Sequence, residues 1–172
     1  MPLSNHLVYI MKKSIALLSF FVFILVSKMT NAQDYRHQLG VRIGSTDQVL
    51  GTGFTYRYLF ANNTAIEGIM DLKDDVALGA LYEKRTPLGN PAGLGWYYGA
   101  GAYVGFGKEN NLGATGILGM EYQFSNNLPI NVSIDWKPEL NLVRDVAFRA
   151  ATIGVSVRFS FGGSSTTVSQ QK

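Results

Sequence analysis

The chain contains no cysteine, few charged residues and no apolar run long enough for a membrane-spanning helix. Of its 172 residues, 16% are charged and 47% are hydrophobic. The absence of cysteine excludes disulfide bonds, thiol catalysis, thiolate metal sites and a lipid-modified cysteine at a signal-cleavage site. Since no segment approaches 18 consecutive apolar residues, the sequence predicts no transmembrane helix.

The net charge of +3 and the pI near 9.1 describe the N-terminal segment rather than the whole chain. Lys12, Lys13 and Lys28 are the only charged residues among the first 32. The remaining 140 residues carry twelve basic and twelve acidic side chains. Because this larger part is formally neutral, we expect no nucleic-acid partner. The length predicts a single domain.

Residues 1–32 are predicted to be an N-terminal extension and a cleavable signal peptide. Two lysines precede the apolar run 15–26, and small residues lead up to Ala32, which is the order of a secretory signal. We expect cleavage between Ala32 and Gln33, near the end of this segment, and export of the mature chain. A retained membrane anchor is the less favoured alternative, because twelve residues are too few to span about 30 Å. Ten residues stand before Met11, which is therefore a second candidate for the start.

The rest of the chain alternates between apolar and polar residues with a period of two, which is typical of β-strands. Links rich in Asn, Asp, Gly and Pro separate the alternating runs, as turns require. Eight strands joined by short links predict an antiparallel up-and-down meander. The eight runs are 39–43, 54–60, 66–72, 76–82, 96–106, 112–124, 130–136 and 153–161.

Two of the links are longer than the others. If the first strand ascends from the periplasm, the link 86–94 lies on the periplasmic side and the link 137–146 lies outside the cell. The second link combines charges with leucines. Two readings stay open for it, since its leucines could pair with a partner or the segment could extend the strands above the membrane.

Charged residues within the strands fall on the polar phase of the alternation, together with many glycines. A soluble barrel would cover its outer phase with charged residues, whereas this phase mixes glycine, tyrosine and single charges of both signs. The pattern predicts a packed polar interior, an apolar exterior, and glycines that make room for Tyr and Arg inside a narrow cylinder. The charges on this phase are Arg42, Arg57, Glu67, Asp71, Glu83, Glu121, Asp135 and Arg158.

Aromatic residues of the apolar phase gather near the strand ends, as in the aromatic girdles of transmembrane barrels. A soluble sandwich would place them in mid-strand. We therefore predict an all-β fold, an eight-stranded antiparallel up-and-down transmembrane β-barrel with a packed polar interior; a soluble barrel or sandwich is the alternative. The predicted lower girdle is Phe60, Tyr82, Trp96, Tyr122, Phe124, Phe159 and Phe161, and the upper girdle is Phe106 and Trp136.

The chain resembles the small eight-stranded outer-membrane β-barrel family, the class of the outer membrane protein A-like barrel domain. The resemblance rests on the signal, the strand count and the aromatic-ended last strand, ATIGVSVRFSF, and it spans residues 33–161. It implies outer-membrane lipid as surroundings and an assembly signal in the last strand for the barrel-insertion machinery. Residues 162–172 form a polar tail that the family usually lacks, and we expect it to be disordered.

The sequence supplies no catalytic, cofactor-binding or metal-binding motif. The glycine-rich pieces are strand glycines, and Asp71, Asp74 and Asp75 are better explained as a solvated turn than as a cation site. Some barrels of this size resemble lipid A-modifying enzymes, which rely on a histidine that faces the outer leaflet. His37, the only histidine after cleavage, starts the first strand and is therefore expected at the opposite, periplasmic rim. The interior acids Glu67, Asp71, Glu121 and Asp135 and the interior arginines Arg42, Arg57 and Arg158 are expected to pair with one another rather than to line a pore.

From these features we expect a non-enzymatic, monomeric protein of a Gram-negative-type outer membrane without a cofactor. Its expected role is structural or surface-interacting. Two alternatives remain open, a soluble exported lipocalin-like ligand-binding barrel and a lipid A-modifying barrel enzyme.

Overall fold

The chain divides into two units, Met1–Ala32 and Gln33–Lys172. The predicted signal peptide and residues 164–172 of the predicted tail lie outside the described residues, so both stay predictions. The described residues contain no helix that is long and apolar enough to cross a membrane. The computed structural model describes residues 35–45, 49–73, 76–106, 111–124, 128–143, 146–150 and 153–163, all in the second unit.

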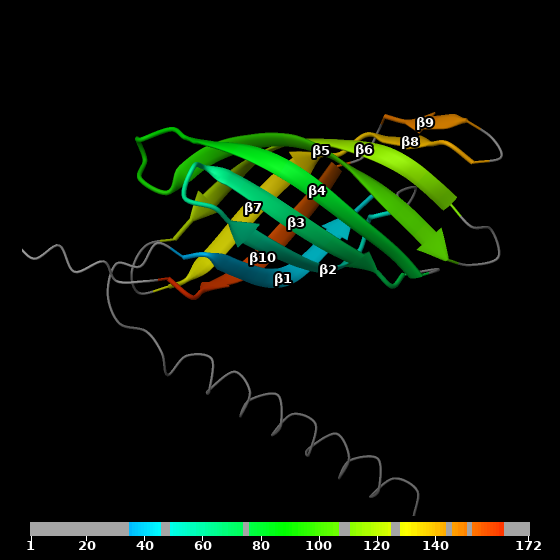
Figure 1. Ribbon diagram of the computed structural model, residues 1–172. Coiled ribbons are helices and arrows are strands. Elements are labelled where there is room, and N and C mark those ends of the chain that lie inside the picture. The colour runs from blue at the N-terminus through cyan, green and yellow to red at the C-terminus, as the bar shows by residue number, and fades with distance from the viewer. Residues whose placement is uncertain are drawn as a thin grey trace, which may run out of the picture. The chain divides into compact units, whose positions relative to one another are not determined.

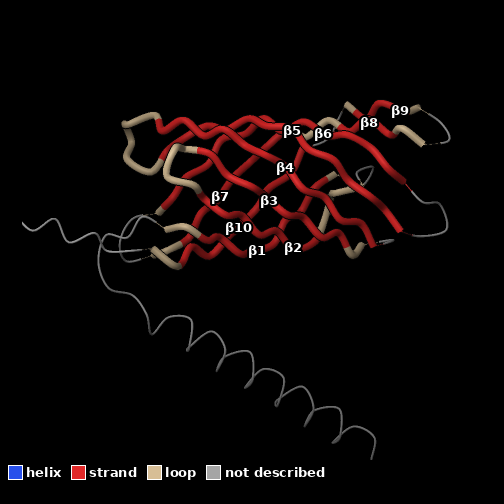
Figure 2. The backbone as a smooth tube through the Cα atoms, in the orientation of Figure 1, coloured by secondary structure: helices blue, strands red, loops and turns tan. Residues whose placement is uncertain are grey.

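The described residues form ten β-strands, eight of which close into an antiparallel barrel (Figure 1). Strands β1 to β7 pair in chain order, and β10 pairs with both β7 and β1, which closes the ring. Figure 2 shows the strands running obliquely around the barrel, as closure of a sheet requires. The strands are β1 His37–Gly44, β2 Gly53–Leu59, β3 Thr64–Asp71, β4 Val76–Pro87, β5 Leu94–Phe106, β6 Asn111–Gln123, β7 Ile130–Trp136, β8 Glu139–Asn141, β9 Ala147–Arg149 and β10 Ile153–Phe161.

The eight alternating runs correspond to the eight barrel strands, so the predicted all-β barrel and its strand order are confirmed. The predicted link 86–94 is too long. Strands β4 and β5 stay paired as far as Pro87 and Gly95, which leaves residues 88–93 as the turn. The alternation does not predict the last residues of β4, because the charged Lys84 lies on the otherwise apolar outer phase, where it is exposed.

The link 137–146 contains the short strand β8 and leads into β9, and both strands extend the barrel sheet, in agreement with the strand-extension reading. Strand β8 continues from β7 along β6 in the same register, and the amide of Gly116 donates to the carbonyl of Pro138 between them. Strand β9 pairs with β8 and leads back to β10. Trp136 was expected at the upper end of the wall, but it lies part-way along it because β8 continues past it.

The barrel wall has an apolar outer face and a polar inner face. On β1, Leu39 and Val41 are 50% and 49% exposed, whereas Gln38 and Arg42 are each 1% exposed. The other barrel strands also turn large apolar side chains outward. Ten of the twelve largest fully buried side chains in the described part of the chain carry a polar group. The interior is therefore packed and polar, as the sequence predicts.

Aromatic rings surround one end of the barrel, which we call the terminal end because β1 begins there and β10 ends there. The opposite end, with the β1–β2 link and the β8–β9 hairpin, is the far end. On β2, β5, β6 and β10, an aromatic ring contacts a second ring two residues away, on the same strand or just past its end. These pairs, with centroids 4.8 to 6.3 Å apart, are Tyr58–Phe60, Trp96–Tyr98, Tyr122–Phe124 and Phe159–Phe161.

Inward-facing glycines make room for large interior side chains, as predicted. A Cβ atom at Gly119 would lie 2.6 Å from the ring of Tyr97, and a Cβ atom at Gly154 would lie 2.5 Å from the guanidinium carbon of Arg42. Both distances are well below van der Waals contact. Each of these glycines therefore provides space that one particular interior side chain occupies.

We expect Gly119→Ala to lower the free energy of unfolding by about 1–3 kcal/mol, because the added methyl group overpacks the barrel against Tyr97. Gly116→Ala is the matched control on the same strand, since Gly116 faces outward and its added Cβ would first meet a Pro138 carbon at 3.5 Å. Urea unfolding of both variants in detergent measures the difference. Equal midpoints would contradict the proposed role of Gly119.

Candidate functional site

Arg57 on β2 lies at the centre of a buried cluster of charges. Its guanidinium lies 3.4 Å from Glu67 on β3 and 2.9 Å from Glu121 on β6. Its Nε lies 3.0 Å from Glu83 on β4, and its Nη2 donates to the same carboxylate at 3.4 Å. None of the four side chains is more than 4% exposed. One arginine thus joins carboxylates from three other strands.

Arg158 on β10 adds a second positive charge to this cluster. It donates to Glu67 at 2.5 Å, to the hydroxyl of Ser133 at 2.8 Å and to the hydroxyl of Thr55 at 3.2 Å. The Thr55 hydroxyl also donates to Glu67. Glu67 therefore bridges Arg57 and Arg158, and its carboxylate has partners on two strands, β2 and β10.

Arg42 on β1 and Asp135 on β7 form a bidentate ion pair, with both N–O distances at 2.7 Å. Both side chains are fully buried. The hydroxyl of Tyr97 donates to Asp135 at 3.1 Å, and the ring of Tyr97 lies 4.6 Å from the guanidinium carbon of Arg57. Tyr97 thereby connects this pair to the cluster around Arg57, through a hydrogen bond on one side and a cation–π contact on the other.

The charge cluster reaches the terminal end of the barrel through Arg85, whose side chain is 21% exposed. Arg85 donates from Nε to Glu121 at 2.6 Å. A pocket of about 370 Å³ opens beside this pair, and Asn63 and Gln123 are among its other lining residues. Arg85 and Glu121 line the pocket, and Arg57 is not among the described residues that line it.

The arrangement closes the interior and balances its charge. Four arginines face four carboxylates in this layer: Arg42, Arg57, Arg85 and Arg158 against Glu67, Glu83, Glu121 and Asp135. An isolated buried charge would be strongly unfavourable, and paired charges with further hydrogen bonds avoid that penalty. The expected pairing of interior charges is confirmed for all three predicted arginines.

Two interior acids differ from the sequence prediction. Asp71 is not among the ion-paired acids of the described residues; it accepts the backbone amides of Thr52 at 2.6 Å and Lys73 at 2.9 Å. It therefore holds the ends of two links at the far end. Glu83 was not among the predicted interior partners, although its position on the polar phase was a signal that it faces the same interior.

Val49 and Leu50, in the β1–β2 link, fold into the far end of the barrel, which the sequence does not predict. The carboxylate of Glu139 accepts the amides of Val49 at 2.8 Å and Leu50 at 3.1 Å, and Lys137 donates to the carbonyl of Leu50. Lys137 and Glu139 lie 3.5 Å apart and are fully buried. We call this group, Val49, Leu50, Lys137 and Glu139, the Leu50 latch.

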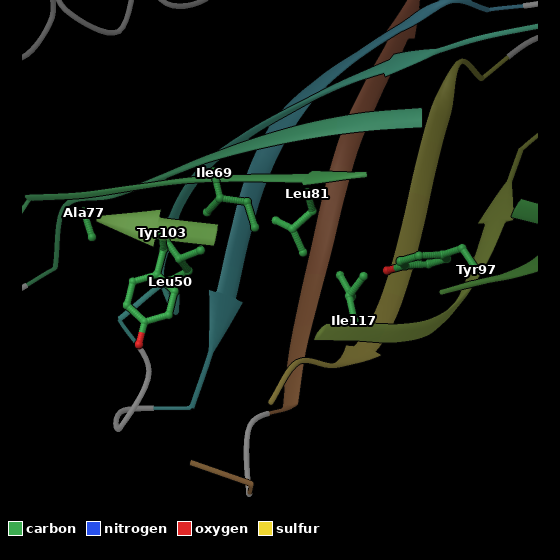
Figure 3. Packing of buried hydrophobic residues seen from close by; sticks show 7 residues of the cluster. All are labelled: Leu50, Ile69, Ala77, Leu81, Tyr97, Tyr103 and Ile117. Atoms are coloured by element: carbon green, nitrogen blue, oxygen red, sulfur yellow. The ribbon is translucent and has the colours of Figure 1, made fainter. Parts of the chain in front are cut away.

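Leu50 belongs to an apolar cluster inside the barrel, which extends from Leu50 to Tyr97 (Figure 3). The Leu50 side chain is fully buried, and it occupies the space where a Cβ atom at Gly79 would be. At the far end, polar contacts of the Leu50 latch thus hold an apolar side chain inside the barrel. The cluster consists of Leu50, Ile69, Ala77, Leu81, Tyr97, Tyr103 and Ile117, with Val49 against it.

His37 lies at the terminal end of the wall, among aromatic rings. Its Nδ1 is 2.8 Å from the Tyr56 hydroxyl, and its ring stacks on Phe161 at 5.4 Å. None of its contacts within the described residues is with a serine or a carboxylate. Across those residues no group of three His, Asp or Glu side chains could hold a metal ion. Asp74 and Asp75 lie outside the described residues.

These features define a class of protein: a closed eight-stranded antiparallel β-barrel with an apolar outer face and an ion-paired interior. No protein-family model matches the chain, and no curated protein matches its sequence. The function therefore has to be inferred from the geometry.

We expect Arg42→Gln to lower the free energy of unfolding by about 3–5 kcal/mol, because it leaves the buried Asp135 carboxylate without its counter-charge. Adding Asp135→Asn to this variant removes the stranded charge and should restore more than half of the loss. Chemical unfolding of the single and double variants measures both effects. A double variant as unstable as the single one would show that charge pairing is not the cause.

We expect Glu139→Ala to speed hydrogen exchange of the Val49 and Leu50 amides by about tenfold or more, since each amide loses a charged acceptor. Asp71→Ala is the matched control, because it frees the amides of Thr52 and Lys73 instead. Residue-resolved exchange by NMR distinguishes the two variants. Unchanged exchange at both latch amides in Glu139→Ala would contradict the latch.

Proposed function

We propose that this protein is an integral β-barrel of a Gram-negative-type outer membrane with a structural or surface-interaction role, and that it is not an enzyme. Its surroundings would be outer-membrane lipid, and it would act as a monomer. Export would depend on the predicted signal at residues 1–32, and insertion on recognition of the last strand by the barrel-insertion machinery. The far end of the barrel would then face outward from the cell.

The polarity of the barrel wall is the observation that carries this proposal. Outward side chains such as Ile43, Phe54 and Val155 are 45 to 69% exposed, and similar side chains surround the barrel. A contiguous apolar surface of this extent is unfavourable in water and favourable in lipid. Because an Arg or Lys facing mid-membrane costs about 2–4 kcal/mol, lipid surroundings also explain why the charges of the strands point inward.

The closed interior supports a structural role over a large pore. The charge cluster around Arg57 occupies the barrel, and the Leu50 latch holds Leu50 inside the far end. Eight-stranded barrels have room inside for side chains or for one small ligand. Here buried side chains, ten of the twelve largest of them polar, take up that room.

The same observations weigh against the two alternatives. A lipocalin-like barrel needs an open internal cavity for its ligand and a polar outer face, whereas the buried ion pairs and the apolar exterior favour the reverse. A lipid A-modifying enzyme would need catalytic groups near the outer leaflet. His37 lies at the terminal end, with aromatic neighbours.

The proposal predicts that the protein stays in washed outer membranes at high salt and dissolves only in detergent. Unboiled samples should migrate differently from boiled ones on a denaturing gel, because a closed hydrogen-bonded barrel resists the detergent until it is heated. Release by high salt, or recovery in the periplasmic fraction without detergent, would support the soluble ligand-binding barrel instead. Altered lipid A mass on deletion of the gene would support the enzyme.

An outward substitution makes the same experiment sharper. Val157 lies in the middle of β10 and is 44% exposed, so Val157→Lys should reduce the amount of heat-modifiable protein in membranes. Lys84→Gln, at an outward position that is already polar, is the control and should leave it unchanged. Wild-type levels of folded Val157→Lys in membranes would argue against lipid contact at this face.

A further inference from the structure

Two buried polar atoms at the far end of the barrel have no hydrogen-bond partner among the residues that the structure describes. They are Oη of Tyr103 on β5 and Nη1 of Arg149 on β9. Tyr103 is 2% exposed, so its hydroxyl is enclosed by the protein. Buried polar groups in native proteins are nearly always paired, so an exception calls for an explanation, of which a bound water or ion is one.

The sheet register brings the two side chains to the same inner surface. Tyr103 pairs with Gly113 on β6, and Gly113 pairs with Asn141 on β8. Because Gly113 has no side chain, the Tyr103 ring lies across it, with its Oη 2.5 Å from the position of a Cβ atom there. Arg149 pairs with the buried Glu139, and directly opposed residues of a sheet share a face. Both donors therefore face the interior beside β8.

Two charges of opposite sign act on the Tyr103 hydroxyl, Glu139 more strongly than Arg149. The Glu139 carboxylate is already engaged, since it accepts two amides of the β1–β2 link and lies 3.5 Å from the Lys137 ammonium. The Arg149 guanidinium is thus a positive charge whose Nη1 still has a hydrogen bond to donate.

We propose that Tyr103 and Arg149 form a binding site for an oxyanion, a carboxylate or phosphate group, at the far end of the barrel. A tyrosine hydroxyl and a guanidinium both donate hydrogen bonds, and the planar guanidinium matches two oxygens of such a group. A cation or an apolar molecule would leave both donors unpaired. Neither donor belongs to the ion cluster around Arg57 or to the Leu50 latch.

This site goes beyond the proposed outer-membrane role and does not depend on it, because the two donors face the barrel interior in any surroundings. If the barrel spans the outer membrane, the oxyanion comes either from solution or from a lipid headgroup. The chemistry of recognition is the same for both sources, so the experiment has to separate them.

The test titrates the folded full chain in uncharged detergent with inorganic phosphate and, separately, with acetate. Tyr103→Phe should weaken binding by about tenfold or more, because the hydroxyl donates to a charged group. It should not lower the melting temperature without ligand, since the hydroxyl has no partner to lose. Tyr97→Phe is the matched control: it loses a hydrogen bond to Asp135, so it should lower stability and leave oxyanion affinity unchanged.

Arg149→Gln provides a second, independent variant and should reduce binding by about tenfold or more. Lys84→Gln removes an exposed positive charge elsewhere and should not change it. Phosphatidylcholine vesicles with and without phosphatidic acid identify the source of the oxyanion. If the Arg149 side chain is protected from chemical modification only when phosphatidic acid is present, the oxyanion is a lipid headgroup. No binding of phosphate, acetate or phosphatidic acid, or full affinity in both site variants, would overturn the proposal.

Discussion

Eight strands close a barrel whose interior is just wide enough for side chains, so a charge inside has to find its counter-charge within that interior. Arg57 meets this constraint with three carboxylates from three strands, and Glu67 meets it by joining two arginines. A shift of any one strand by a single residue would turn its charge to the outer face and leave its partners unpaired. The ion cluster therefore specifies the register of the sheet as well as filling it.

The same constraint makes the fold depend on its surroundings. Buried ion pairs contribute little net stability compared with apolar side chains of similar size, because each charge loses its hydration. In this barrel the inner layer is polar and the large apolar side chains lie outside. A barrel of this kind gains little from burying its core and much from an apolar medium around its wall. In the proposed membrane, specific ion pairing inside the barrel and non-specific solvation of its outer face by lipid would complement each other.

The alternation of the sequence was sufficient for the eight barrel strands, because a wall with a polar inner face and an apolar outer face imposes a period of two. It failed at β9, where Phe148 and Ile153 both point outward although they are five residues apart. Trp136 pairs with Ile153, and Glu139 pairs with Arg149. Three residue steps separate Trp136 from Glu139, whereas four separate Arg149 from Ile153. This one extra residue reverses the inward–outward alternation on that side.

The charge phase likewise predicted which side chains share the interior. It could not predict which of them pair across it, since partners such as Arg42 and Asp135 are 93 residues apart and meet only through the stagger of the closed barrel. The inward fold of Leu50 has no periodic signal at all.

The position of the Leu50 latch also bears on the order in which the barrel is completed. Leu50 belongs to the first hairpin and Glu139 to the last, and the seam between β1 and β10 lies between those hairpins. The two residues are 89 positions apart in the chain, so bringing them together while the strands are free carries a large loop-closure entropy. Once β1 has paired with β10, the same contact costs little. The latch is therefore a late-forming contact that reports ring closure, and an intermediate with an open seam would leave Leu50 outside the interior.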